Sequence, residues 1–296
     1  MCIRDSFNVL RRTLRLHQWA KNFLVFAALL LSHGYTDPTK IAAACVVFLA
    51  LGLCASGTYI WNDLLDLADD RNHPSKRFRP LASGVIHIRD GVLLSLICVL
   101  GGLVLALLVL GAPIAAALLV YIILTVAYSL HFKRVLAADV ILLAGLYLYR
   151  IYLGGLAIEA PLTDWLLAFS IFFFLSLGYA KRLTDIPPHK RDKEDAIPGR
   201  AYIGLDAITI TALGVSAAAS SIIVMALYIT DEQVLQNYSS PQLLWVICLL
   251  LLYWLNRLWL LVFRGAVPSD PISFALRDRA SQICGILICL VIFAAR

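Results

Sequence analysis

Long apolar stretches alternate with short polar segments along almost the whole chain. A membrane-spanning helix needs about 20 mostly apolar residues, and a run of about 18 or more with few charges is a candidate span. The pattern predicts an all-α, polytopic membrane protein, with residues 1–296 forming one transmembrane domain and residues 1–16 a short basic arm. We expect about nine transmembrane helices, with approximate bounds 19–35, 41–66, 91–110, 113–131, 138–158, 162–181, 203–229, 242–263 and 279–296.

The composition agrees with this interpretation and excludes a soluble globular protein. Hydrophobic residues make up 61% of the chain and charged residues only 15%, whereas soluble domains average about 45–50% and about 25%. The net charge of +6 could indicate a nucleic-acid partner, but the bases are spread over several loops between the predicted spans. Anionic lipid headgroups and a phosphorylated substrate explain such a distribution better, so we expect membrane lipids and no nucleic acid as partners.

The positive charges also predict the orientation. Cytoplasmic loops of membrane proteins carry an excess of Lys and Arg. With a cytoplasmic N-terminus, only Lys40, Arg150 and Arg296 of the 25 Lys and Arg residues fall outside the inner segments. An odd number of helices then puts the C-terminus outside, in a multi-pass protein of the cell (inner) membrane.

A group of acidic residues lies where the second predicted helix leaves the membrane. At about 100° per residue, Asp63 and Asp70 fall roughly 20° apart on a helix, and Asp66 lies about 60° to one side. Asn62 lies about 40° from Asp66 and can join this face, whereas Asp69 points elsewhere. We call this expected surface the aspartate face, and under the predicted orientation it opens to the cytoplasm.

Three carboxylates in a partly desolvated place repel one another unless a cation holds them. Hard oxygen ligands suit Mg²⁺, which takes its remaining ligands from water and from substrate phosphates. The sequence therefore predicts Mg²⁺ on Asp63, Asp66 and Asp70, with Asn62 beside them as a catalytic-site residue. A solvated loop with mutually balanced charges is the alternative, but such charges have no reason to repeat at helical spacing.

Several basic or hydroxyl-bearing residues are candidates for binding substrate phosphates. Arg71, Lys76 and Arg79 follow the aspartate face directly. Arg150 lies about 18 Å along the fifth predicted helix, where a charge is costly unless it is paired or lines a wet cavity; structural pairing with a polar group is its alternative role. The remaining candidates are Lys21, Tyr128, Lys133, Lys181 and Arg182; for Lys21 the alternative is snorkelling to headgroups, and for Lys133 it is an anchoring role.

The residues of the aspartate face resemble a family signature. Asn62, Asp63, Asp66 and Asp70 follow the spacing N-D-x-x-D-x-x-x-D, which resembles the first aspartate motif of the UbiA superfamily of intramembrane prenyltransferases. Further segments look like the branch that contains decaprenyl-phosphate phosphoribosyltransferase; they are residues 17–22, 70–74, 79–84, 181–182, 270–271 and 274–279. The resemblance implies a UbiA-like helical bundle over nearly the whole chain and a diphosphate held by Mg²⁺.

The branch resemblance implies transfer of 5-phosphoribose from phosphoribosyl diphosphate to a polyprenyl (decaprenyl-type) phosphate, as used in cell-envelope polysaccharide synthesis. One departure from the family pattern bears on this. Typical aromatic prenyltransferases carry a second aspartate-rich motif after the sixth helix, whereas this chain has Lys181 and Arg182 there, and Pro188 stands between Asp185 and Asp192 where an acid would be expected. More cationic groups would suit a reaction with more phosphate to neutralise.

Two other functions remain open at this point. A UbiA-type enzyme could instead move a prenyl group from a prenyl diphosphate to an aromatic or other small acceptor, using the same aspartate face. A transporter or channel with an acidic mouth would need polar residues along several spans, and the sequence has few apart from Arg150. The chain length of the lipid and the oligomeric state stay open, and a homo-oligomer is compatible with the sequence.

Overall fold

The computed structural model describes residues 3–72, 76–160, 162–197, 199–232, 238–267 and 270–295. Within these ranges the regular elements are helices, and an isolated β-bridge joins Ala196 and Ile203. His73 and Pro74, which belong to one of the segments that resemble the family, and Arg296, the end of the last predicted helix, lie outside the described residues.

Seven helices in the described ranges are long and apolar enough to cross a membrane. They are α3 (Pro38–Leu65), α5 (Ile88–Leu110), α6 (Ala112–Leu130), α7 (Ala138–Ala157), α8 (Asp164–Asp185), α9 (Asp206–Thr230) and α11 (Trp245–Phe263). Two shorter apolar helical segments, Leu16–Leu31 and Arg279–Ala295, correspond to the first and last predicted spans. The all-α fold predicted from the apolar runs is therefore confirmed.

The first and sixth predicted helices differ from the expected bounds. The first consists of a 3₁₀ helix, η1 (Leu16–Leu24), followed by α2 (Val25–Leu31), and is shorter than the predicted 19–35. The sixth, α8, continues past the predicted end at residue 181 to Asp185. Its last turn carries Arg182, so this turn stays helical although its side chains are charged.

The remaining elements are short. Two of them follow the long helix α3: α4 (Leu67–Asn72) and η3 (Lys76–Phe78). The others are α1 (Ile3–Thr13), η2 (Gly34–Thr36), η4 (Phe132–Arg134), η5 (Pro188–Lys190), η6 (Pro241–Leu244), α12 (Pro271–Ala275) and α13 (Arg279–Ala295).

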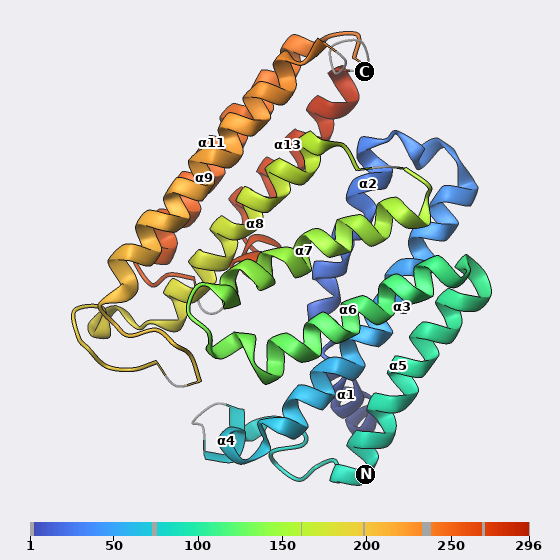
Figure 1. Ribbon diagram of the computed structural model, residues 1–296, viewed down its shortest axis with the longest axis vertical. Coiled ribbons are helices and arrows are strands. Elements are labelled where there is room, and N and C mark those ends of the chain that lie inside the picture. Colours follow the sequence, from blue (N-terminus) through green and yellow to red (C-terminus); the bar gives the residue numbers. More distant parts are fainter. Residues whose placement is uncertain are drawn as a thin grey trace. The chain divides into compact units, whose positions relative to one another are not determined.

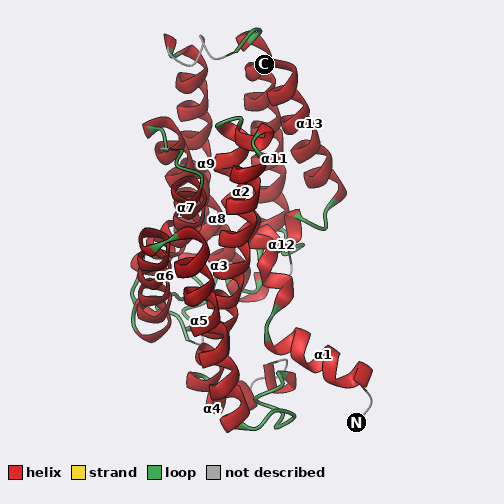
Figure 2. Cartoon of the chain, turned by 90° about the vertical axis from the view of Figure 1, so that its right-hand side faces the viewer, coloured by secondary structure: helices red, strands yellow, loops and turns green. Residues whose placement is uncertain are grey.

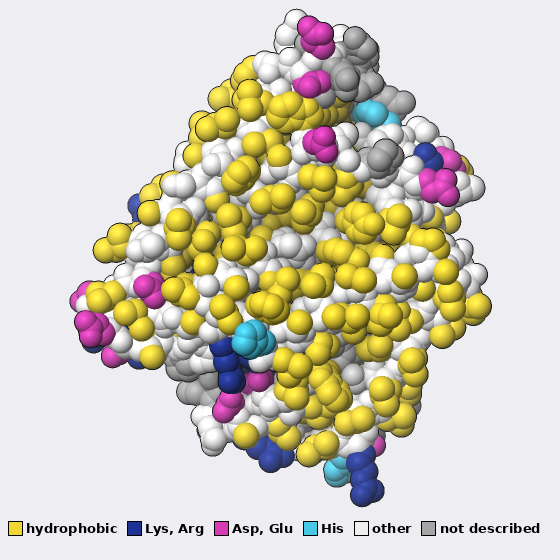
Figure 3. All heavy atoms as spheres, viewed as in Figure 1, with side chains coloured by type: hydrophobic (Ala, Val, Ile, Leu, Met, Phe, Trp, Pro, Cys, Tyr) yellow, Lys and Arg dark blue, Asp and Glu magenta, His cyan; other side chains and the backbone are white. Residues whose placement is uncertain are grey.

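Large apolar side chains point outward from the long helices. Leu108 on α5, Ile208 on α9 and Leu249 on α11 are 77%, 76% and 66% exposed. Apolar side chains cover most of the face seen in Figure 3. Such surfaces are unfavourable in water but are solvated by lipid tails, which identifies a multi-pass membrane protein.

The chain divides into two compact units, each described by itself below. Unit 1 comprises Met1–Leu130 with Tyr149–Pro161, and unit 2 comprises His131–Leu148 with Leu162–Arg296. Figures 1 and 2 show the course of the chain through the helices. Helix α7 contributes its first part to unit 2 and its last part to unit 1.

The core of unit 1 is the pairing of α3 with α5, which depends on small residues. A Cβ atom at Gly57 would lie 2.6 Å from Val99 Cγ2 and 2.8 Å from the Ser95 carbonyl oxygen. The Ser95 hydroxyl donates a hydrogen bond to the Gly57 carbonyl at 2.8 Å. Small residues let two helices approach closely in a membrane, where packing rather than the hydrophobic effect holds helices together. This close contact holds α3, which carries the aspartate face, against α5.

The core of unit 2 is the pairing of α8 with α9, which α11 joins. Trp259 of α11 packs against Gly214 of α9, and its indole nitrogen donates to the Ser176 hydroxyl of α8 at 3.0 Å. Arg191, in the segment after α8, donates to the carbonyls of Ile186 at 3.2 Å and Val262 at 3.3 Å, and also to that of Phe263. Since the last carbonyls of a helix lack partners within it, this arginine caps the ends of α8 and α11.

Candidate functional site

The aspartate face lies at a break between two helices. Helix α3 ends at Leu65, and Asp66 is its C-cap residue, with φ −91° and ψ 11°. The chain resumes as α4 at Leu67, and the Asp70 amide donates to the Asp66 carbonyl at 2.8 Å. The helical spacing used to place the three aspartates on one face is therefore interrupted at Asp66, because α3 ends at Leu65 and α4 begins at Leu67.

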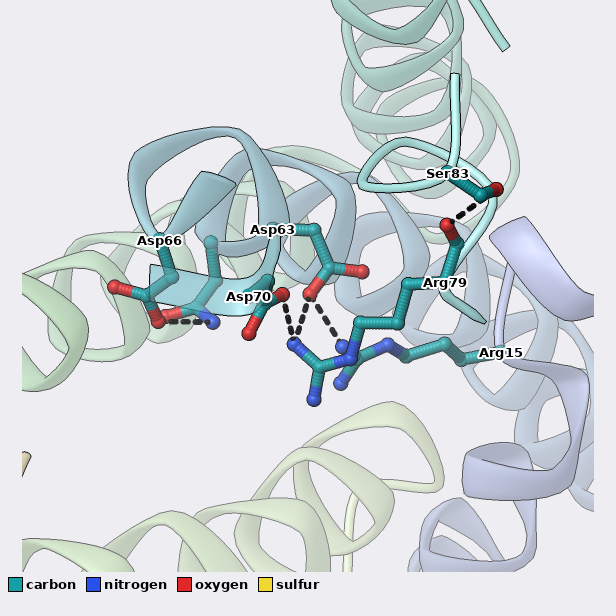
Figure 4. Close-up of polar contacts among 7 residues, drawn as sticks. Arg15, Asp63, Asp66, Asp70, Arg79 and Ser83 are labelled. Carbon is teal, nitrogen blue, oxygen red and sulfur yellow. Dashed lines mark hydrogen bonds and ion pairs between the residues drawn. The ribbon is translucent and has the colours of Figure 1, made fainter. Parts of the chain in front are cut away.

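Asp63 and Asp70 nevertheless converge, and two arginines meet them (Figure 4). The Arg79 guanidinium contacts Asp63 Oδ1 at 2.9 Å and Asp70 Oδ2 at 2.5 Å. Arg15 forms a second ion pair with Asp63 Oδ1. Asp63 is 7% and Asp70 only 2% exposed, and buried carboxylates need such compensation. These four side chains form what we call the aspartate–arginine cluster.

Asp66 lies apart from this cluster. The Asn62 amide donates to Asp66 Oδ2 at 3.1 Å, so these two predicted site residues do contact each other. Figure 4 shows the Asp66 carboxylate directed away from Asp63 and Asp70. In the part of the chain that the structure describes, no three His, Cys, Asp or Glu side chains are grouped closely enough to hold a metal ion.

The residues present fit Mg²⁺ by donor type. Mg²⁺ is usually bound by one or two carboxylates, with waters and substrate phosphates as its other ligands. Asp63 and Asp70 supply such a pair, buried and already oriented toward positive charge. The arginines beside them can bind the oxygens of a phosphate that a metal also contacts.

A second polar group of unit 1 is buried among the helices. Arg150 of α7 is 5% exposed; its Nε donates to Asn22 Oδ1 at 3.2 Å and its NH2 to the Tyr121 hydroxyl at 2.8 Å. Lys21 of η1, next to Asn22 in the chain, is 6% exposed. We call Lys21, Asn22, Tyr121 and Arg150 the buried basic group.

Tyr59 of α3 lies beside the aspartate–arginine cluster. The Arg15 guanidinium lies over the Tyr59 ring, 5.4 Å from the ring centre. Tyr59 precedes Asp63 by one helical turn on α3. The Tyr59 ring therefore helps to hold the Arg15 guanidinium beside Asp63.

The other predicted phosphate-binding residues of unit 1 are more exposed. Arg71 on α4 and Lys76 on η3 are exposed, and Tyr128 near the end of α6 is partly exposed.

Arg182 in unit 2 forms ion pairs within the protein. It is 1% exposed, and its Nε lies 2.6 Å from Oδ2 of Asp139, which is fully buried. Its NH1 contacts Asp185 at 2.5 Å, and Arg200 lies 3.7 Å from the same Asp185 oxygen. Tyr202 donates to Asp139 Oδ1 at 2.7 Å. The Arg182 charge is therefore already neutralised by carboxylates.

The same network engages the residues that follow α8. Burial and the hydrogen bond to Asp139 raise the pKa of Tyr202, so the phenol stays neutral and keeps its role as donor. Asp185, which lies where a second acidic motif would be expected, forms ion pairs with two arginines. Asp192 is exposed. Lys181 is partly exposed on α8, and Lys133 contributes its carbonyl as acceptor to Arg200 at 3.4 Å.

Sequence reasoning missed three residues of these groups. Arg15 was counted only among the positive charges of the cytoplasmic side, and its contact with Asp63 spans 48 positions. Asn22 stood in the segment 17–22 that resembles the family, which was a usable signal. Tyr121 lies in an apolar run and carried no signal in the sequence.

The chain is similar to known proteins over most of its length. The model of the UbiA prenyltransferase family matches residues 22–278. The uncharacterized protein y4nM of Sinorhizobium fredii is 40% identical over 93% of this chain, and the match spans 53% of that relative's length. The chain thus spans about half of that longer relative.

Two further relatives match over most of both chains. Nodulation protein NoeC of Azorhizobium caulinodans is 32% identical over 91% of this chain and 87% of its own length. Decaprenyl-phosphate phosphoribosyltransferase of Mycobacterium tuberculosis is 28% identical over 92% and 89%.

A solved structure supports the fold. A UbiA homolog from Archaeoglobus fulgidus bound to GPP and Mg²⁺ aligns with a TM-score of 0.70 and 20% identity, over 97% of this chain and 99% of that one. At this identity the likeness concerns the fold.

Proposed function

Because the chain belongs to the UbiA prenyltransferase family, we propose that it is a Mg²⁺-dependent transferase that moves 5-phosphoribose from phosphoribosyl diphosphate to a polyprenyl phosphate. The observation that carries this proposal is the buried Asp63–Asp70 pair with Arg79 and Arg15 upon it. The match to decaprenyl-phosphate phosphoribosyltransferase over most of both chains supports the choice of substrates.

In the reaction, the bond between the anomeric carbon and the diphosphate breaks, and the diphosphate leaves with the electron pair. An oxygen of the lipid phosphate forms the new bond to that carbon; being already an anion, it needs no strong base. Mg²⁺ held by Asp63 and Asp70 would neutralise charge on the departing diphosphate. Arg79 can bind the same leaving group through charge-assisted hydrogen bonds.

The buried basic group has a second role in this proposal. A phosphoribosyl diphosphate donor carries a 5-phosphate, and the lipid carries a phosphate of its own. Lys21 and Arg150 supply two cations buried in unit 1, and the Tyr121 hydroxyl and Asn22 orient the Arg150 guanidinium. A guanidinium held in this way suits binding of a phosphate. We assign one of these two phosphates to this group, with Arg71 and Lys76 as exposed contacts for the incoming donor.

A prenyl transfer to an aromatic or other small acceptor is the second candidate function. The Archaeoglobus fulgidus homolog bound to GPP and Mg²⁺ favours it, since that protein holds a prenyl diphosphate. Against it stands the ion-paired state of Asp185, which removes the nearest carboxylate from a second acidic motif. The first candidate needs only the Asp63–Asp70 pair of unit 1.

The decisive experiment incubates membranes containing the chain with labelled phosphoribosyl diphosphate and polyprenyl phosphate. The proposal expects a labelled lipid that requires Mg²⁺, and we expect Asp63→Asn to reduce its formation by at least about 100-fold, as loss of a metal ligand does. Asp69→Asn is the matched control, because Asp69 is an exposed neighbour on α4 and its change removes the same charge.

Full activity in Asp63→Asn would disprove the assignment of the site. No labelled lipid, together with prenylation of an aromatic acceptor, would support the second candidate. The same assay in sealed vesicles tests the proposed orientation, because the charged donor does not cross the membrane. Inverted inner-membrane vesicles should be active without detergent and right-side-out vesicles inactive; the reverse would refute a cytoplasmic site.

A further inference from the structure

Arg15 is held in a specific position between α1 and η1. Its backbone has φ 49° and ψ 45°, in the left-handed region that non-glycine residues rarely occupy. The turn is fixed by hydrogen bonds from the Arg15 amide to the Arg12 carbonyl at 3.3 Å and from the Gln18 amide to the Arg15 carbonyl at 2.7 Å. The turn directs the guanidinium onto Tyr59 and Asp63.

The N-terminal helix is also tied to the segment that carries Arg79. The Arg12 guanidinium donates to the Phe78 carbonyl at 3.1 Å, one residue before Arg79. One contact therefore links the two segments that deliver both arginines to Asp63.

The aspartate–arginine cluster is balanced without a metal. Two buried carboxylates face two guanidinium groups, and Asp63 Oδ1 receives both. A divalent cation entering this cluster would meet two positive charges, which opposes its binding. Its affinity must then depend on whether a guanidinium withdraws from the carboxylate.

The two arginines differ in the number of carboxylates that they contact. Arg79 bridges both carboxylates, and its carbonyl accepts from the Ser83 hydroxyl at 2.9 Å. Arg15 contacts one oxygen of one carboxylate, Asp63 Oδ1. Arg15 is thus the arginine whose displacement breaks fewer ion pairs of the cluster.

We propose that Arg15 is the resident counter-ion of Asp63, that a divalent cation competes with it for this carboxylate, and that the displaced guanidinium binds a diphosphate oxygen of the substrate. This inference rests on the proposed function. It assigns Arg15 as a substrate-binding residue whose contacts depend on whether the metal and the diphosphate are present. When the metal and the diphosphate are absent, Arg15 neutralises the Asp63 carboxylate.

The test measures Mn²⁺ binding to the purified full chain in detergent micelles, without substrate, from the loss of the free Mn²⁺ signal in electron paramagnetic resonance. Arg15→Gln should bind Mn²⁺ about fivefold more tightly than the wild type, because a cation in contact with the ligand is removed. Arg11→Gln is the matched control: Arg11 is an exposed arginine of α1, and its loss should leave Mn²⁺ affinity unchanged. Arg15→Lys keeps the charge and should stay near the wild type.

A second titration adds inorganic pyrophosphate to the Mn²⁺-saturated protein. Arg15→Gln should bind pyrophosphate about fivefold more weakly, since one charge-assisted contact is lost. The two affinities thus move in opposite directions, whereas damage to the fold would weaken both.

The outcomes separate this inference from the function on which it rests. Mn²⁺ binding that is abolished by Asp63→Asn but unaltered or weakened in Arg15→Gln overturns the role of Arg15 and leaves the metal site standing. No Mn²⁺ binding in the wild type, or equal binding in Asp63→Asn, overturns the metal site and the inference with it.

Discussion

Arg182 is a candidate phosphate ligand by sequence, but in the structure it forms an ion pair with Asp139. A structural role and a phosphate-binding role make different predictions for its replacement. The perturbation is Arg182→Met, which keeps much of the side-chain volume and removes the charge. Arg182 is 1% exposed and Asp139 fully buried, so the change leaves a carboxylate inside unit 2 without its cation. We therefore expect a loss of folding stability in addition to any loss of activity.

The magnitude follows from the partners that remain. Removing one member of a buried ion pair costs about 3–5 kcal/mol. Asp139 keeps its hydrogen bond from Tyr202 at 2.7 Å, which offsets about 1 kcal/mol. We expect Arg182→Met to lower the free energy of unfolding by about 3 kcal/mol. In Asp139→Asn, Arg182 retains Asp185, so the loss should be only about 1–2 kcal/mol.

The assay is reversible unfolding in mixed micelles of a mild detergent and dodecyl sulfate, followed by tryptophan fluorescence. The double variant with both changes should be more stable than Arg182→Met alone, since no unpaired charge is left buried. Lys181→Met is the matched control, because Lys181 is the partly exposed neighbour on α8 and its loss should change stability by less than about 0.5 kcal/mol. If Arg182→Met unfolds like the wild type but is inactive, the structural reasoning is refuted and the phosphate-binding role is favoured.

Two further predictions concern other contacts. Gly57→Ala should destabilise unit 1 by about 1–3 kcal/mol, because the new methyl group would lie 2.6 Å from Val99 Cγ2. Gly101→Ala is the control and should not destabilise the protein, because a Cβ there meets no atom within 4 Å. Equal effects of the two changes in the same unfolding assay would contradict the packing argument. The hydrogen bonds from Arg257 lower the pKa of Asp278 from 3.8 to about 2. A carboxyl whose pKa is lowered by folding stabilises the protein above its unfolded pKa and loses this contribution as the pH falls. Melting temperatures should therefore drop between about pH 4 and pH 2 in the wild type by more than in Asp278→Asn, and identical pH profiles would exclude this contribution.

The class of fold and the position of the acidic residues follow from local features of the sequence. Apolar runs near 20 residues have one stable form in lipid, since each backbone group must be bonded within its own helix. That constraint is local, so the spans could be read without tertiary information. Helical periodicity likewise brought Asp63 and Asp70 to one face, and both meet Arg79 in the structure.

Contacts between distant segments follow from the packing of the helices and could not be predicted from the sequence. Nothing within a helical turn of Arg15 indicates that it pairs with Asp63, 48 positions away. The role of Arg182 depends in the same way on Asp139, which lies on another helix. The sequence does not distinguish an arginine that binds a phosphate from one that binds a carboxylate. Which anion it meets depends on how the helices pack, because burial forces each charge to take the partner that packing brings within reach.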